Sequence, residues 1–147
     1  MILRKMKDFT EGEWEAKKFL SKAGAQCQIT RIGEVNGFPF DDADSKMHYV
    51  YSVKLRREHK TYTFRFYDSA DNYFKDERPT VYDVLACVEK YEPCDDVWDF
   101  AEEFGYEIND RKSFESVSHI HKECKKQYGK LLSLFGEELM DELREIY

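Results

Sequence analysis

The clearest structural signal in the chain lies in residues 47–67, which read "MHYVYSVKLRREHKTYTFRFY". Apolar side chains recur there at every second position and share one face: Tyr49, Tyr51, Val53 and Leu55, then Tyr62, Phe64 and Phe66. This period of two predicts half-buried strands over 47–56 and 61–67. The link "RREHK" makes them a hairpin, although it lacks the Asn-Gly or Asp-Gly pair that favours the tightest turns.

Upstream of this hairpin, the sequence predicts one more strand and one helix. The strand covers 26–35, where β-branched residues alternate loosely with polar ones. The helix begins at a capping box of Thr10 and Glu13 and ends near Gly24, because glycine readily adopts the left-handed conformation. Residues 1–9 are predicted to form a flexible arm.

Downstream of the hairpin, apolar residues recur in steps of three and four, which indicates helices. Thr80 and Asp83 start the first of these helices, and Pro93 ends it. Asp95 is expected to cap a second helix that ends at Gly105. The residues on the apolar stripe of this second helix are Val97, Phe100, Ala101 and Phe104.

A long helix is predicted over about 111–135, and a short final helix follows Gly136. The apolar stripe of the long helix consists of Phe114, Val117, His121, Cys124, Tyr128, Leu131 and Phe135. The predicted order is therefore α-β-β-β-α-α-α-α. It describes an α+β fold, in which a three-stranded antiparallel sheet after an N-terminal helix is packed by a C-terminal helical block.

The chain is expected to be a single domain over its 147 residues, with 41% hydrophobic residues to build the core. No repeat or low-complexity segment divides it, so the helix plus sheet (10–68) and the helical block (79–147) belong together. The four cysteines include no Cys-x-x-Cys pair, the N-terminus does not resemble a signal peptide, and no run of 18 apolar residues exists. These features predict a cytoplasmic protein with reduced thiols and no membrane contact.

Charge is divided unevenly along the chain, whose formal net charge is −7. Residues 1–68 contain 13 Lys and Arg against 10 Asp and Glu, whereas residues 69–147 contain 10 against 20. Such asymmetry indicates either partners of opposite sign or mutual attraction of the two halves, and a single compact domain favours attraction. The overall acidity argues against sequence-independent binding to phosphate backbones.

No residue pattern predicts a catalytic, metal or cofactor site. A row of Asp95, Asp99 and Glu102 on one exposed helix would diverge into water rather than surround a cation. His121 and Cys124 share a helix face, but that face is the apolar stripe, which favours a core histidine beside a buried thiol. Cys87 has no base paired with it in the sequence, so the chain is interpreted as a non-enzyme.

The longest acidic stretch, 91–110, contains eight carboxylates and no Lys or Arg. An amphipathic helix explains where the acids lie but not why no cation interrupts them, since like charges in adjacent turns repel. Trp98 lies off the centre of the apolar stripe and can anchor a basic protein partner, although the same acids can also serve only to keep the helix soluble. The predicted partner-binding residues are Asp95, Asp96, Trp98, Asp99, Glu102, Glu103 and Glu107.

The hairpin offers an alternative, because positive charge gathers along residues 54–65. A basic sheet can hold a single-stranded nucleic acid, and charges at a hairpin tip can also serve only to keep a strand edge soluble. The predicted residues of this alternative nucleic-acid site are Lys54, Arg56, Arg57, Lys60 and Arg65.

Three segments resemble a family of small proteins encoded by phages and other mobile elements of Gram-positive bacteria. They are "FYDS" at 66–69, "RPTVYDVLACVEKY" at 78–91 and "FAEEFGYEIND" at 100–110, and the likeness extends to the closing "ELREIY". It covers most of the chain from about residue 12. The turn "EHK" departs from it, since glycine is expected there, and the loop 70–78 is longer than expected.

The resemblance implies an accessory protein of a mobile element, acting in the bacterial host cytoplasm. A frequent role of such proteins is to block host defence, and some anti-CRISPR proteins are small, acidic and non-enzymatic. The implied partner is a defence nuclease such as a Cas effector, whose basic nucleic-acid channel would receive carboxylates in place of phosphates. No catalytic residues are implied.

Overall fold

The computed structural model describes residues 11–36, 47–69, 79–92 and 94–146. The elements are α1 (Glu11–Ala23), β1 (Ala25–Asn36), β2 (Met47–Arg57), β3 (Lys60–Ser69), α2 (Val81–Glu89), α3 (Val97–Phe104) and α4 (Arg111–Ile146). Gly136 has φ 81° and ψ 168°, so α4 consists of two helices that meet at a kink. The predicted α+β order is confirmed. The predicted arm 1–9 and the capping role of Thr10 lie outside the described residues.

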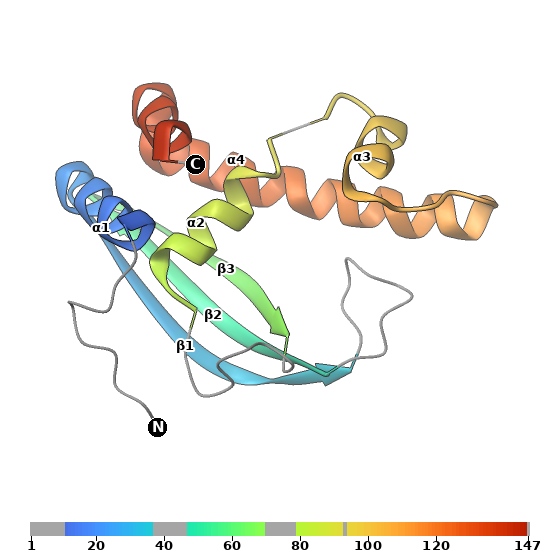
Figure 1. Cartoon of the computed structure of the whole chain (residues 1–147), viewed down its shortest axis with the longest axis horizontal. Coiled ribbons are helices and arrows are strands. Elements are labelled where there is room, and N and C mark those ends of the chain that lie inside the picture. Colours follow the sequence, from blue (N-terminus) through green and yellow to red (C-terminus); the bar gives the residue numbers. More distant parts are fainter. Residues whose placement is uncertain (1–10, 37–46, 70–78, 93, 147) are drawn as a thin grey trace.

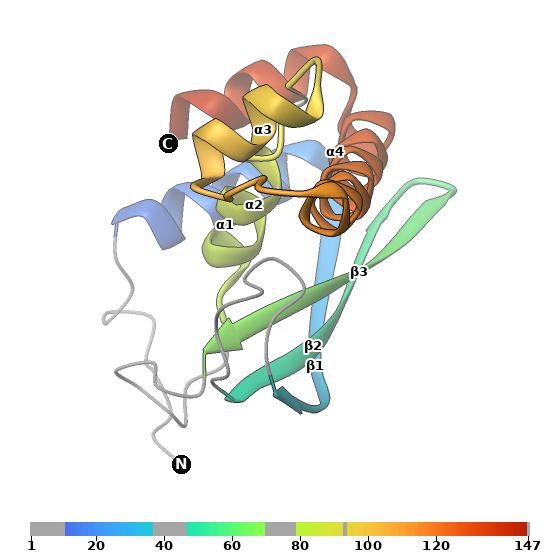
Figure 2. The ribbon, with the colours of Figure 1, turned by 90° about the vertical axis from the view of Figure 1, so that its right-hand side faces the viewer.

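The three strands form one antiparallel sheet in the order β1-β2-β3. Its register pairs Val53 of β2 with Ile29 of β1 and with Phe64 of β3, so apolar residues of all three strands share one face. The helices are gathered on the side of that face (Figures 1 and 2). The alternation seen in the sequence therefore separates a covered face from a polar one, as expected for an antiparallel sheet.

The β2–β3 hairpin closes with a two-residue turn, because Arg57 pairs with Lys60. Glu58 is the first turn residue and has a φ of 54°, the only positive φ of a described residue other than glycine. A left-handed backbone costs an L-residue roughly 1 kcal/mol relative to glycine. The departure noted in the sequence, an "EHK" turn where glycine is expected, is thus a local strain in the structure.

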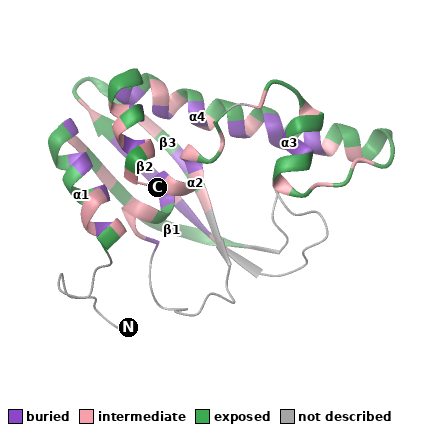
Figure 3. Ribbon diagram, turned by 45° about the horizontal axis from the view of Figure 1, so that its top comes forward, coloured by how far each residue is buried: buried purple, intermediate pink, exposed green. Residues whose placement is uncertain are grey.

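The main core lies between the sheet and the helices α1, α2 and α4. Its most deeply buried side chains are Val53, Leu55, Val84, Leu85, Leu131, Leu134, Met140 and Leu143. Buried residues line the inner sides of these helices in Figure 3. Burial of each such aliphatic side chain contributes about 1.5–3 kcal/mol.

A second, smaller cluster joins α3 to the N-terminal part of α4. Phe100 and Ala101 of α3 pack there on Val117, Ile120 and Cys124 of α4. The predicted apolar stripe of α3 is confirmed. Because α3 rests on α4 rather than on the sheet, it projects from the body of the molecule (Figure 1).

The predicted buried stripe of α4 is confirmed except at its first residue. Phe114 is 37% exposed, whereas Val117, one turn further on, is the first buried residue of the helix. Phe114 contacts α3 at Trp98, whose side chain is itself 59% exposed, so the contact buries neither ring. The sequence spacing therefore predicted burial at a position whose neighbour is open to solvent.

The starts of α2 and α3 differ in how well the sequence predicted them. At α2, Thr80 and Asp83 form a complete capping box, which confirms the expectation. At α3, the expected cap Asp95 is wrong: Asp96 has the extended φ and ψ of −136° and 169°, and its carboxylate accepts the Asp99 amide at 2.8 Å. The two acids are adjacent, and only Asp96 stands three residues before an amide that needs an acceptor.

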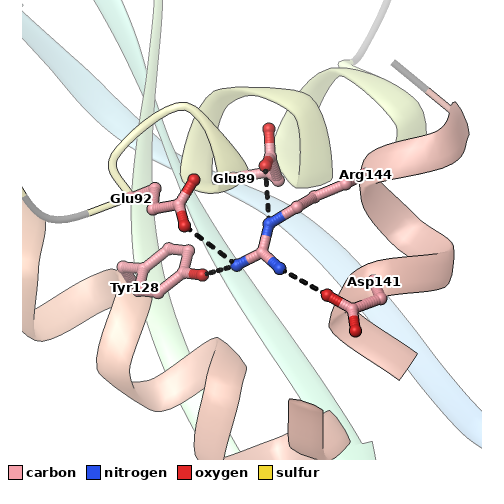
Figure 4. Close-up of polar contacts among 5 residues, drawn as sticks. All are labelled: Glu89, Glu92, Tyr128, Asp141 and Arg144. Carbon is pink, nitrogen blue, oxygen red and sulfur yellow. Dashed lines mark hydrogen bonds and ion pairs between the residues drawn. The ribbon is translucent and has the colours of Figure 1, made fainter. Parts of the chain in front are cut away.

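The final helix is attached to the end of α2 by Arg144 (Figure 4). Its guanidinium lies 2.7 Å from Asp141, 3.3 Å from Glu92 and 3.5 Å from Glu89, and donates to the hydroxyl of Tyr128. The Arg144 side chain is 33% exposed. This cluster places two acids of the α2 end beside a fixed positive charge.

Side chains of the basic half also contact α4. Lys22 forms an ion pair with Glu142 at 2.9 Å. Lys60 donates to the carbonyl oxygen of Ser133, and Lys130 donates to that of Thr63. Both an ion pair and hydrogen bonds to carbonyl oxygens therefore join the two halves.

Candidate functional site

The predicted acidic surface lies on and around α3, where all seven of its residues are exposed. Their placement follows from the helical period of 3.6 residues. Asp99 and Glu103 are one turn apart on one flank, and Trp98 and Glu102 are one turn apart on another. These four residues thus divide between two sides of α3, so the predicted seven do not form one patch.

The Asp99 flank faces the end of α2 across a groove of about 800 Å³. The groove is lined by Glu89, Lys90, Glu92, Cys94, Asp95, Asp99, Glu103 and Phe104. Lys90 lines it, and Arg144 lies at Glu89 and Glu92. Tertiary structure therefore supplies to the groove the cations that the sequence of 91–110 lacks.

Cys94 sits in this groove and donates a hydrogen bond to Glu103 at 3.3 Å. Its pKa is raised, first by loss of solvation and then by the bond to Glu103 and the charges of Glu103, Asp99 and Asp95. A thiol among carboxylates stays protonated near neutral pH and is a poor nucleophile. The groove therefore contains no activated thiol among its described residues.

The Trp98 flank carries the most exposed large apolar side chain among the described residues. Trp98 is 59% exposed, and its ring lies 5.8 Å from that of Phe114, at an angle of 37°. Glu102 lies one turn along α3 from the tryptophan. The sequence analysis placed Phe114 in the core and therefore missed it as the partner of Trp98. No pattern in the sequence indicated that Phe114 is exposed.

Several carboxylates of the stretch 91–110 have structural roles. Asp96 caps α3, and Asp110 caps α4 by accepting the Ser113 amide at 2.7 Å. This hydrogen bond is the main cause of the lowered pKa of Asp110. Glu92 pairs with Arg144.

The remaining acids of the surface differ from these. Asp95, Asp99, Glu102 and Glu107 have no side-chain hydrogen bond or ion pair with any described residue. Lys90 lines the same groove as Asp95 and Asp99, but no described cation lies within ion-pair distance of these four side chains. They are the carboxylates that a partner could use without breaking the fold.

The five basic residues of the alternative site point to two different sides of the sheet. Arg57 donates to the carbonyl oxygens of Ala23 and Leu134, at 2.8 and 3.2 Å, and Lys60 donates to that of Ser133. These two residues therefore attach the hairpin to the helices. The other three, Lys54, Arg56 and Arg65, are exposed on the opposite face of the sheet.

A third feature is an apolar cleft of about 620 Å³ beside α2, which Cys87 helps to line. Burial raises the pKa of the Cys87 thiol, and its sulfur lies 3.1 Å from the hydroxyl of Tyr91. His121 bonds the carbonyl oxygen of Cys94 at 3.0 Å and packs on Phe100. The cleft thus contains no base that would activate the thiol among the contacts described.

Metal and membrane features are absent from the part of the chain that the structure describes. No group of three or more His, Cys, Asp or Glu side chains there could hold a metal ion. No helix in the described ranges is long and apolar enough to cross a bilayer.

Comparison with known proteins finds no matching family model, no matching curated protein and no matching solved structure. The resemblance to mobile-element proteins therefore stays a prediction from the sequence. The functional argument depends on the surface of the molecule itself.

Proposed function

We propose that this protein is a non-enzymatic binding protein that docks the α3 end of the molecule on a basic protein partner. The observation that carries the proposal is the exposed pair of Trp98 and Phe114 beside carboxylates that no described side chain neutralises. Tryptophan is among the residues most enriched at the energetic centres of interfaces.

Two physical effects favour a cationic partner. The face of an exposed indole attracts a Lys or Arg side chain, by about 0.5–1 kcal/mol in water and more once water is excluded. The carboxylates of Asp95, Asp99 and Glu102 would pair with further cations and speed the encounter. The partner surface should therefore be basic, with an apolar or cationic group that covers the Trp98 ring.

The class of partner that we propose is a host defence nuclease, with a Cas effector as the first candidate. Nucleases bind phosphates through clusters of Lys and Arg, and carboxylates present the same charge and acceptor oxygens to those clusters. The support for this step is the charge of the surface together with the family resemblance, so it is an analogy of class.

The first experiment measures binding of purified protein to candidate nucleases, with Trp98→Ala as the test variant. We expect affinity to fall by about 2 kcal/mol, roughly thirtyfold, since an anchor tryptophan contributes at least that much. Trp98 is exposed, so its loss should change the stability of the free protein by less than about 1 kcal/mol. Unchanged affinity in the folded variant would rule out the aromatic anchor.

A second variant tests the charges while preserving the fold. Asp95, Asp99 and Glu102 are changed together to Lys, whereas the cap Asp96 is left intact. The matched control makes the same change of charge at Glu137, Glu138 and Glu145, which are exposed on the final helix. We expect the first variant to lose binding and the control to retain it; equal loss in both would mean that only net charge matters.

A further inference from the structure

On the sheet face that points away from the helices, the described side chains from Ser52 to the hairpin turn are polar and include no acid. The described side chains of this face between the bulge of β1 and the hairpin turn are Gln26, Gln28, Thr30, Ser52, Lys54, Arg56, Thr61, Thr63 and Arg65. All are exposed except Ser52, which is half-buried. In a chain with a net charge of −7, this face combines three cations with neutral amides and hydroxyls.

The three cations form a connected row. Lys54 and Arg56 are two residues apart on β2, which corresponds to about 7 Å along a strand. Arg65 of β3 is paired with Ser52, so it is a diagonal neighbour of Lys54, also at about 7–8 Å. The row therefore presents positive charge at nearly even intervals across two adjacent strands.

The exposed part of this sheet face ends where the neighbouring residues are buried or bonded to other elements. Val50 lies on the same face of β2 but is only 7% exposed, so the open part begins at Ser52. Towards the turn, Arg57 and Lys60 bond carbonyl oxygens of other elements and are directed to the helices. No described helix or strand packs on the area between.

We propose that this face binds single-stranded nucleic acid through its phosphates, at a site separate from the acidic α3 end. Phosphate oxygens accept hydrogen bonds from Lys and Arg, and also from Gln and Thr side chains, which make up most of the rest of the face. A protein partner would need an apolar anchor at the centre of the contact, and this stretch of the face has none among its described residues.

The width of the face favours one strand over a duplex. Three strands span about 10 Å, and among the described elements no helix projects from this side to enter a major groove. Binding should be weak and independent of sequence, because only three charges contribute and the rest of the molecule repels phosphate. For three neutralised phosphates, the affinity for a single strand should fall with salt at a slope of about −2, or roughly fifteenfold between 50 and 200 mM.

The test measures fluorescence anisotropy of a labelled twelve-nucleotide oligo(dT), titrated with the full chain at low salt. The variant Lys54→Ala, Arg56→Ala, Arg65→Ala should lose binding by at least tenfold. A matched control removes three exposed cations from α4, by changing Lys122, Lys125 and Lys126 to Ala, and should bind as the unchanged protein does. The variant Trp98→Ala should also bind normally, since the α3 end takes no part.

Three outcomes would overturn the proposal. They are no binding at 20 mM salt, equal losses in the test and control variants, and tighter binding of a poly-glutamate peptide than of the oligonucleotide. The last outcome would assign the face to an acidic protein instead. Failure here leaves the α3 surface untouched, because the two sites share no residue.

Discussion

At the scale of single residues, neighbours in the sequence have separate roles that their chemistry does not reveal. Asp95 is open to solvent, whereas Asp96 caps a helix. Arg56 is exposed on the outer sheet face, whereas Arg57 bonds two carbonyl oxygens. Each pair has the same residue type at adjacent positions, one exposed and one with a structural role. Substituting the two members separately therefore distinguishes an effect on binding from an effect on folding.

Glu58 is the residue whose backbone departs most from its preference. Its φ of 54° costs an L-residue roughly 1 kcal/mol, and glycine removes this cost. We expect Glu58→Gly to raise the free energy of unfolding by about 0.5–1 kcal/mol, measured as a shift of the urea midpoint at constant slope. Glu58→Ala, which keeps the side-chain restriction, should bring no such gain; an equal gain would attribute the effect to the lost charge.

At the scale of secondary-structure elements, α3 depends most on its ends. It has eight residues, and short isolated helices are marginal in water. Its start is held by the Asp96 cap and its end by Gly105 with a φ of 77°. Packing on α4 and these two caps therefore hold in place the surface that carries Trp98.

We predict that Asp96→Ala destabilises the protein by about 1 kcal/mol, because the Asp99 amide loses its acceptor. Asp95→Ala should change stability by less than about 0.5 kcal/mol. Thermal unfolding followed by circular dichroism checks both, and 1 kcal/mol corresponds to about 2–4 °C in a chain of this length. A larger effect at Asp95 than at Asp96 would contradict the observed cap.

At the scale of the whole molecule, the two proposed surfaces carry opposite charges. Open carboxylates lie around α3, and open cations lie on the outer face of the sheet. The layers between are joined by the Arg57 bonds, the Lys60 bond and the Arg144 cluster. Such a molecule can present an acidic surface to one partner and a basic one to another.

Arg57 provides the test of how the sheet is attached to the helices. Arg57→Ala removes charged hydrogen bonds to the carbonyl oxygens of Ala23 and Leu134, and we expect a loss of about 2 kcal/mol in the free energy of unfolding. Arg56→Ala removes the same charge without these bonds and should cost less than about 0.5 kcal/mol. Denaturant unfolding measures the free energy of unfolding of the two variants. Equal values would show that Arg57 contributes no more to stability than its surface charge.

The sequence by itself determined the elements and their order. Apolar residues alternate with polar ones around Val53 and Phe64, which is the period of a strand. They recur in steps of three and four at Val117, Cys124 and Leu131, which is the period of a helix. Both periods depend only on the local backbone, so they are the same in the sequence and in the folded protein. The sequence also determined that the charges of the chain are divided between its halves. The helix caps at the starts of α2 and α3 were predicted to within one residue. The error at α3 arose because Asp95 and Asp96 are adjacent acids and either could act as the N-cap.

Only the tertiary structure decided which side chains meet and which stay open. It brought Arg144 to Glu89 and Glu92, left Trp98 and Phe114 exposed together, and placed the carbonyl oxygens of Ala23 and Leu134 at the Arg57 guanidinium. The physical reason is that burial depends on what lies opposite a residue, and that neighbour is distant in the chain. The spacing in α4 predicted Phe114 as core, because no local pattern records that its neighbour in space, Trp98, is itself exposed.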